Sequence, residues 1–126
     1  MTKSTKPTQY FQLKDLAKSQ ATNAKKIERL TIHYKDAYAG ALSQVDYYLE
    51  NAWNSTLNHY AIDTLYSETS TTRQKSRVIN GGYYQAIIKL LEWYEIPTSY
   101  ATAFYLANID NINSMMNSDL EDLINN

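Results

Sequence analysis

The feature that most constrains this chain is a long segment of apolar residues at helical spacing. Between residues 27 and 60 there is no proline and one glycine, and apolar side chains recur three or four positions apart: Tyr34, Tyr38, Ala41, Val45, Tyr48 and Ala52. This spacing places them on one face of a helix, and polar residues such as Asp46 fall on the opposite face. The pattern predicts one long amphipathic helix over about residues 22–65.

A second apolar segment, at about residues 82–95, predicts a central helix. Apolar side chains surround its axis and leave a thin polar strip made of Gln85, Lys89 and Glu92. A helix that is apolar nearly all round is covered by neighbouring elements. Pro97 ends this helix, because a proline ring clashes with the preceding turn.

Additional helices are predicted at both ends of the chain, and a capping box at Ser118 and Glu121 marks the start of a short C-terminal one. No segment alternates between apolar and polar residues long enough to indicate a strand. We therefore expect an all-α fold with four or five helices, in which the long helix packs with the central helix and with the C-terminal helices.

The length of 126 residues fits a single helical domain. Residues 1–7 are polar and are predicted to be flexible, and residues 67–82 are predicted to form a polar linker that ends in Gly81 and Gly82. There is no cysteine, signal-like apolar run or membrane-length apolar segment in the sequence. We therefore expect a cytoplasmic protein that does not enter a membrane.

Charge is unevenly distributed along the chain. Residues 1–35 carry eight basic and two acidic groups, whereas residues 36–126 carry four basic and eleven acidic groups. The net charge of −1 therefore conceals a basic N-terminal part and an acidic remainder. Opposite charges of this kind attract one another, either within one fold or between neighbouring molecules.

Residues with catalytic or metal-binding spacing are not found in the sequence. His33 and His59 are far apart, and neither has a second ligand-type residue three or four positions away in a metal-binding pattern. Nucleophile, phosphate-loop and dinucleotide motifs are also missing. The sequence therefore predicts a protein that is not an enzyme and has no catalytic residue, cofactor or metal site.

A cluster of basic residues precedes the central helix. It consists of Arg73, Lys75 and Arg77, three of the four basic residues found after position 35. Two interpretations are open, an anion site and a solvated hinge. The hinge is favoured because Gly81 and Gly82 add backbone freedom at the same place. Cations are unfavourable near the start of a helix, and this mismatch is what an anion site would produce. If the cluster binds an anion, the candidate contacts for nucleic-acid phosphates are these three residues together with Lys25, Lys26 and Arg29.

Aromatic residues are abundant, with twelve tyrosines in the chain. Most lie on apolar stripes and are typical of core positions with the hydroxyl group at the edge. Tyr47 differs, because it projects from the polar face of the long helix. The candidate interface residues are Tyr38, Val45, Tyr47, Tyr48 and Trp53.

These observations favour a non-enzymatic helical interaction protein that self-associates as a homo-oligomer or binds another protein. The alternative is a nucleic-acid-binding accessory protein that uses the basic residues above. A third hypothesis is an acidic inhibitor that mimics nucleic acid with its C-terminal part. The abundance of Lys, Asn, Tyr and Ile, which have AT-rich codons, indicates a low-GC genome. Small proteins that are rich in Tyr and Asn and lack cysteine are common among phage and plasmid accessory proteins.

Overall fold

The computed structural model describes the backbone of residues 12–125 and the side chains of residues 22–125. The predicted flexible segment 1–7 lies outside this range. Within it the all-α prediction is confirmed, and the part of the chain described contains six α-helices and no strand. In chain order the elements are α1 (Gln12–His33), α2 (Lys35–Ala52), the 3-10 helix η1 (Trp53–Thr56), α3 (His59–Tyr66), α4 (Thr72–Trp93), the 3-10 helix η2 (Thr98–Tyr100), α5 (Ala101–Ala107) and α6 (Ile109–Asn125).

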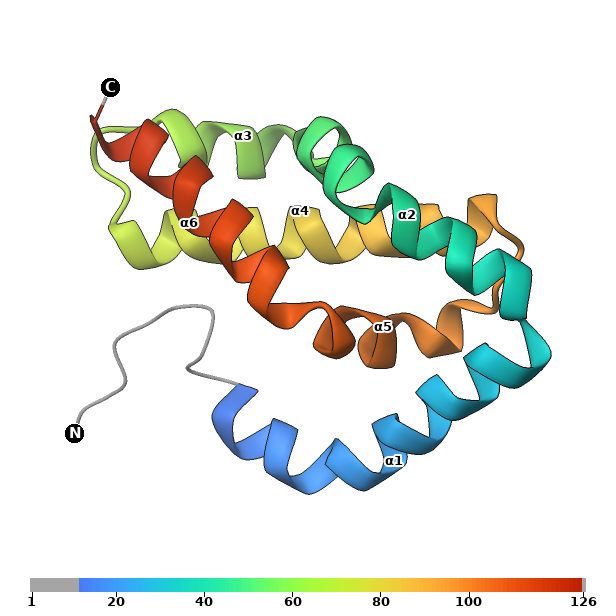
Figure 1. The fold of residues 1–126 in the computed structure, drawn as a ribbon. Helices are drawn as coiled ribbons and strands as arrows, with labels where there is room; N and C mark the ends of the chain where they lie inside the picture. The colour runs from blue at the N-terminus through green and yellow to red at the C-terminus, as the bar shows by residue number, and fades with distance from the viewer. Residues whose placement is uncertain (1–11, 126) are drawn as a thin grey trace.

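Helix α4 is the centre of the fold. It runs the length of the molecule, and α2, η1, α3, α5 and α6 all pack against it (Figure 1). Its inward side chains are buried: Ile79, Tyr83, Ala86, Ile87, Leu90 and Leu91. The prediction of a central apolar helix is therefore confirmed, although the helix begins ten residues earlier than predicted, at Thr72.

The predicted single helix over residues 22–65 is wrong, because three separate helices occupy this range. The chain bends at Tyr34, whose φ of −127° and ψ of 36° lie outside the helical region. Helix α1 packs on α5, whereas α2 packs on α4, so the two helices face different partners. The Tyr34 ring meets the Tyr100 ring edge-on at 5.8 Å on the α1–α5 side. Tertiary packing overrides helix propensity at this position.

A second break separates α2 from α3. After Ala52 the chain forms the 3-10 helix η1, and at Leu57 its backbone is extended. Helix α3 then begins after Asn58, whose side chain accepts a hydrogen bond from the Ala61 backbone N–H at 2.9 Å. Asparagine is a favourable residue at this capping position. The apolar stripe itself was predicted correctly within α2, where Tyr38, Ala41, Val45 and Leu49 are buried.

The predicted linker over residues 67–82 is also wrong for most of its length. Only residues 67–71 connect α3 to α4, because α4 begins with a reciprocal cap. The Thr71 hydroxyl accepts from the Gln74 backbone N–H at 3.1 Å, and the Gln74 side chain accepts from the Thr71 backbone N–H at 2.7 Å. This capping box satisfies two backbone donors and starts the helix inside a polar sequence.

The two glycines of that predicted linker lie inside α4. Gly82 is buried where α4 crosses η1, and an added Cβ atom would lie 2.6 Å from the Trp53 backbone oxygen. Gly81 is exposed, with no atom within 4 Å of an added Cβ. Gly82 therefore permits close helix packing, and it does not form a hinge.

The last helix differs from its prediction as well. Helix α6 is continuous from Ile109 to Asn125, so the predicted helix start at Ser118 does not occur. Ile112 and Met116 are the buried residues of α6. Because α6 packs against α4, the helix continues through Ser118. Among the described helices none is both long enough and apolar enough to cross a membrane.

Candidate functional site

An aromatic groove lies between α2 and the C-terminal end of α4. It has a volume of about 350 Å³ and is lined by Gln44, Tyr47, Tyr48, Leu90, Trp93 and Tyr94. Tyr47 is 72% exposed and Trp93 is 79% exposed. Large aromatic side chains on opposite helices are thus presented to solvent around one hollow, which is the kind of surface that proteins use for contacts.

Close packing of two helices builds the floor of this groove. Gly40 of α2 lies beneath the Tyr94 ring, where an added Cβ atom would come within 2.6 Å of the ring carbon Cε1. Leu90 is buried at the base. The absence of a side chain at Gly40 therefore lets the Tyr94 ring lie directly on the α2 backbone and brings the ends of the two helices together.

Backbone strain occurs at the end of α4 beside the groove. Glu95 has a φ of 59°, in the left-handed region that glycine usually occupies. The Ile96 N–H donates to the Leu91 carbonyl at 2.9 Å and the Glu95 N–H to the Glu92 carbonyl at 3.0 Å. This pattern is a Schellman cap, in which the left-handed residue is most often glycine. A glutamate therefore occupies a position where glycine would be more stable.

We expect Glu95→Gly to raise the free energy of unfolding by about 0.5–1 kcal/mol, because glycine adopts the left-handed conformation without a steric penalty. Urea denaturation followed by circular dichroism measures the change. Glu92→Gly is a matched comparison, since Glu92 is exposed within the last turn of α4 and should lose stability on the same replacement. A less stable Glu95→Gly variant would contradict the assignment of strain.

Negative charge surrounds the end of α4 next to the aromatic groove. Glu92 and Glu95 are exposed, the last turn of α4 contains no basic residue, and Lys89 lies one turn earlier. The C-terminal carbonyl groups of a helix add a partial negative charge at the same place. The C-terminal end of α4, whose residues Trp93 and Tyr94 line the groove, therefore carries exposed carboxylates.

The predicted interface residues divide into two groups. Tyr47 and Tyr48 line the groove. Tyr38, Val45 and Trp53 do not form a surface: they are buried in the core, so their assignment to an interface is wrong. Tyr38 meets the Phe104 ring edge-on at 6.0 Å, and Trp53 stacks on Tyr83 at 5.7 Å. The apolar stripe of α2 is used for packing within the chain.

The sequence analysis does not identify Trp93 as an exposed residue, although it lines the groove. It was grouped with the apolar side chains of the central helix, although it lies four positions after Lys89 and next to Glu92. These two residues belong to the polar strip of α4, and residues four apart share a helix face. The sequence therefore contained a signal that Trp93 faces solvent.

One residue of the basic cluster, Lys75, has a structural role. The Lys75 ammonium group donates to the backbone oxygens of Leu65 at 2.9 Å, Ser67 at 2.8 Å and Thr64 at 3.5 Å. These carbonyl groups lie at the C-terminal end of α3, where helices have unpaired acceptors and a partial negative charge. Lys75 is thus the cation that caps α3, which corrects its assignment as both an anion contact and a solvated hinge residue.

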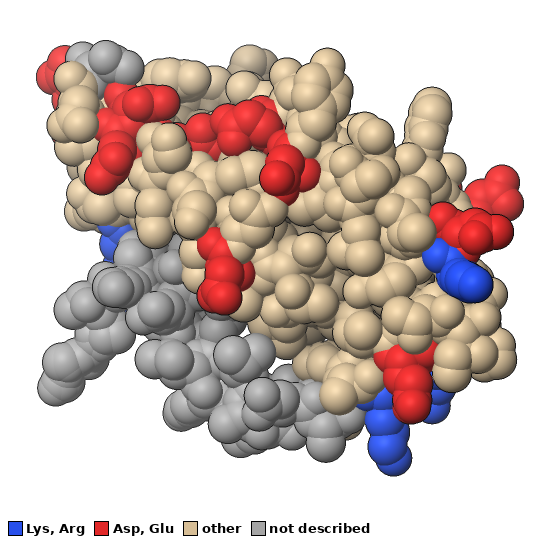
Figure 2. Space-filling model, in the orientation of Figure 1, with Lys and Arg blue, Asp and Glu red and all other residues tan. Residues whose placement is uncertain are grey.

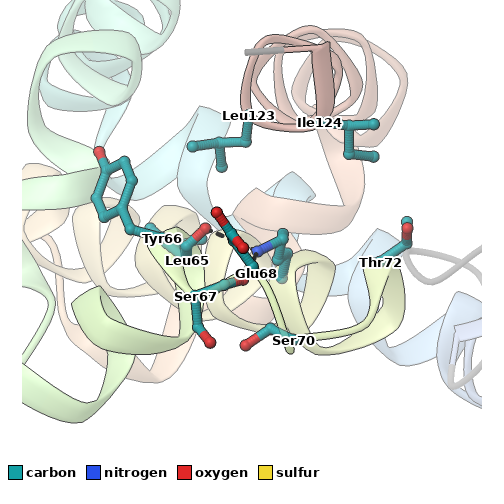
Figure 3. Close-up of a pocket in the computed structure, with 9 residues that line it drawn as sticks. Leu65, Tyr66, Ser67, Glu68, Ser70, Thr72, Leu123 and Ile124 are labelled. Atoms are coloured by element: carbon teal, nitrogen blue, oxygen red, sulfur yellow. Dashed lines mark hydrogen bonds between the residues drawn. The ribbon is translucent and has the colours of Figure 1, made fainter.

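A pocket beside Lys75 is shown in Figure 3. Its volume is about 560 Å³, and Leu123 and Ile124 of α6 lie across it from Ser67 and Ser70 in the α3–α4 connection. The Glu68 carboxylate belongs to the same lining. Because the ammonium group of Lys75 already donates to three carbonyl oxygens, the pocket does not offer that cation to a phosphate group.

The other predicted phosphate contacts lie in two places. Arg73 and Arg77 are exposed near the start of α4, and Lys25 and Arg29 are exposed on α1. Lys26 donates a hydrogen bond to the Ser99 backbone oxygen at 3.2 Å and so joins α1 to η2. The start of α4 and the α1–α2 corner lie at opposite ends of the molecule (Figure 1). The fold does not gather these cations into one basic surface.

A pair of carboxyl groups lies where α2 and α6 meet over α4. The Tyr83 hydroxyl donates to Asp119 Oδ2 at 2.5 Å and lies 3.4 Å from Glu50 Oε1. Burial, together with the negative charge of Asp119 and of the more distant Asp122, raises the pKa of Glu50. Burial and the adjacent Asp119 also raise the pKa of Tyr83, which keeps its hydroxyl protonated as the donor. Acidic side chains gather over α6 on this face, with basic ones at its edges (Figure 2).

We expect the Glu50 carboxyl to make stability depend on pH. Because its pKa is higher in the folded state, its stabilising effect is fully present below the unfolded-chain pKa of about 4.3 and is lost as the pH rises through the folded-state pKa. Glu50→Gln should therefore raise the melting temperature most at neutral pH and least in mild acid. Thermal denaturation of both proteins between neutral and mildly acidic pH measures this difference, and Glu121→Gln on α6 is the control. A Glu50→Gln effect that is independent of pH would contradict the expectation.

Side chains suited to metal binding do not cluster among the described residues: no three His, Cys, Asp or Glu residues there are arranged to hold an ion. His33 ends α1 and His59 begins α3, and both are exposed. No protein-family model, curated protein or solved structure matches this chain. The aromatic groove presents two of the most exposed large aromatic side chains among the described residues, Tyr47 and Trp93.

Proposed function

We propose that this chain is a non-enzymatic helical interaction protein, and that the aromatic groove between α2 and α4 is the surface through which it self-associates or binds another protein. The observation that carries the proposal is the pair formed by Tyr47 and Trp93, which remain largely exposed on the two walls of one groove. Tyrosine and tryptophan are the residues most often responsible for binding energy at protein interfaces.

Two properties of the groove support this function. Its base is rigid, because Gly40 and Tyr94 hold the two helices in contact and Leu90 is buried beneath them. A rigid base lowers the entropic cost of binding, since the aromatic anchors are already positioned. In addition, the strained Glu95 directly follows Tyr94, which lines the groove. Strain of this kind is commonly retained where a side chain is needed for binding.

The test compares a groove variant with a matched surface variant. Tyr47→Ser combined with Trp93→Ser removes both aromatic walls, and Tyr60→Ser removes an aromatic side chain that is 84% exposed on α3, outside the groove. Light scattering at tens of micromolar and affinity capture from cells of the source organism measure self-association and partner binding. We expect the groove variant to lose an association that the wild type and Tyr60→Ser retain.

Two results would contradict the proposal. One is a wild-type protein that stays monomeric and captures no partner. The other is an association that survives unchanged in the Tyr47→Ser/Trp93→Ser variant. Circular dichroism of each variant controls for folding, which should be retained because both aromatic side chains are mostly exposed.

A further inference from the structure

Helix α4 contains the dipeptide Asn80–Gly81, the one asparagine–glycine pair in the sequence. The backbone nitrogen of the residue after an asparagine is able to attack the asparagine side chain. Glycine at that following position leaves the nitrogen unhindered and lets the backbone adopt the geometry of attack. Asn80 is therefore the asparagine of this chain that is most reactive in this way when the chain is unfolded.

The reaction is a deamidation that uses water alone as its co-reactant. The Gly81 nitrogen forms a bond to the Asn80 Cγ atom, and the bond between Cγ and Nδ2 breaks. The Nδ2 group leaves as ammonia with the proton that the Gly81 nitrogen gives up, and a cyclic succinimide remains. Water then opens the ring at Cγ to give aspartate, or at the backbone carbonyl carbon to give isoaspartate. In isoaspartate the main chain runs through the Cβ and Cγ atoms of residue 80.

The folded chain opposes this reaction in two ways. Gly81 lies inside α4, where its N–H belongs to the helical hydrogen-bond ladder and the ψ angle of Asn80 is helical. Closure of the five-membered ring requires this angle to leave the helical region. In addition, Asn80 Oδ1 accepts a hydrogen bond at 2.6 Å from the hydroxyl group of Tyr105, a buried residue of α5. The amide group is therefore held away from attack while α4 and α5 remain packed.

Isoaspartate at position 80 would not fit the core around it. Ile79 and Tyr83 are four positions apart and both are buried, so they share the inner face of α4. The additional backbone carbon lies between them and shifts the position of Tyr83 and Gly82 relative to Ile79. Aspartate at this position keeps the normal backbone, and its carboxylate is able to accept the same hydrogen bond from Tyr105. The isoaspartate product alone therefore prevents α4 from packing.

We infer that Asn80–Gly81 is a spontaneous modification site that the folded chain protects, and that isoaspartate formation there makes the unfolding of α4 irreversible. Because the reaction requires α4 to open, its rate in the native protein is the rate in the unfolded chain multiplied by the open fraction. This inference is independent of the aromatic groove and of the proposed function.

Peptide mapping measures the reaction at this site alone. Trypsin cleavage after Arg77 and Lys89 releases residues 78–89, in which Asn80 is the single asparagine. The protein is incubated at mildly alkaline pH in buffer and in guanidinium chloride, and a zero-time digest is subtracted. Mass spectrometry measures the conversion of amide to acid, and chromatography separates isoaspartate from aspartate. We expect conversion in the native protein to be at least about a hundredfold slower than in denaturant.

Two variants separate the chemistry from its protection. Gly81→Ala hinders the attack and has space in the fold, so conversion in denaturant should fall about tenfold or more. Lys75→Met removes the ammonium group that caps α3 and leaves residues 78–89 unchanged. Its conversion in denaturant should equal that of the wild type. Its conversion in buffer should rise by the factor that its measured loss of stability predicts, about tenfold for each 1.4 kcal/mol.

Refolding measures the consequence of the modification. After prolonged incubation in denaturant and dilution into buffer, the recovered helical circular dichroism of the wild type should fall in proportion to its isoaspartate content. Gly81→Ala, incubated for the same time, should recover its helical signal. Asn80→Asp carries the other product and should also refold, which assigns the loss to the altered backbone.

Four results would overturn the inference. One is a wild-type peptide 78–89 that stays unmodified in denaturant, and another is equal conversion in buffer and in denaturant. The third is native conversion in Lys75→Met that does not follow its stability. The fourth is full refolding of protein that contains isoaspartate at position 80.

Discussion

Replacing Gly82 by alanine should lower the free energy of unfolding by about 2 kcal/mol, whereas the same replacement at the adjacent Gly81 should raise it by up to about 1 kcal/mol. At Gly82 the new methyl group would lie 2.6 Å from the Trp53 backbone oxygen and 3.2 Å from Leu57 Cδ2. That oxygen also accepts a hydrogen bond from the Thr56 hydroxyl at 2.9 Å, so it is held in place. Helix α4 and η1 must therefore move apart to accommodate the alanine methyl group.

Gly81 is the matched control, because it shares the helix, the local sequence and the substitution. No atom lies within 4 Å of its added Cβ, so alanine brings its helix propensity without a clash. Urea denaturation of both variants gives the two free energies. Equal effects at the two positions would contradict the close contact between α4 and η1.

Lys75→Met should lower the free energy of unfolding by about 1–3 kcal/mol. Methionine keeps most of the aliphatic stem but removes the ammonium group, which leaves the backbone oxygens of Leu65 and Ser67 without their charged donor. Hydrogen bonds to charged groups contribute more than neutral ones, and a buried acceptor that loses its partner is costly. Thermal and urea denaturation measure the loss.

Lys89→Met on the same helix is the comparison for Lys75, since Lys89 is exposed and its replacement should change stability by no more than about 0.5 kcal/mol. A Lys75→Met protein as stable as the wild type would show that the ammonium group makes no net contribution as a cap.

Much of the fold could be predicted from periodicity in the sequence. The buried face of α2, the central position of α4 and the end of α4 before Pro97 all follow from apolar spacing and backbone chemistry. The sequence also contains a signal for the start of α4, because Thr71 and Gln74 have the spacing of a capping box. The surrounding segment nevertheless predicts a linker, because serine, threonine and basic residues dominate it.

Other features depend on contacts that a linear pattern does not contain. The bend at Tyr34 arises because α1 and α2 pack on different helices, and this difference is set by residues around position 100. The role of Gly82 requires the neighbouring Trp53 backbone, 29 positions away. The aromatic groove likewise combines residues from α2 and α4 that are more than forty positions apart. The sequence alone can indicate whether each residue of the groove is exposed, but it does not show that these residues lie together.

The unequal contacts of α1 and α4 imply a gradient of local stability through the molecule. Six elements pack against α4, so we expect its central amide groups to exchange hydrogen with solvent only when the whole fold opens. Helix α1 packs mainly on the short helix α5 and is joined to α2 through the non-helical Tyr34. We therefore expect α1 to detach in a sub-global opening that leaves α4 protected, and its amide groups should exchange before those of any helix packed against α4.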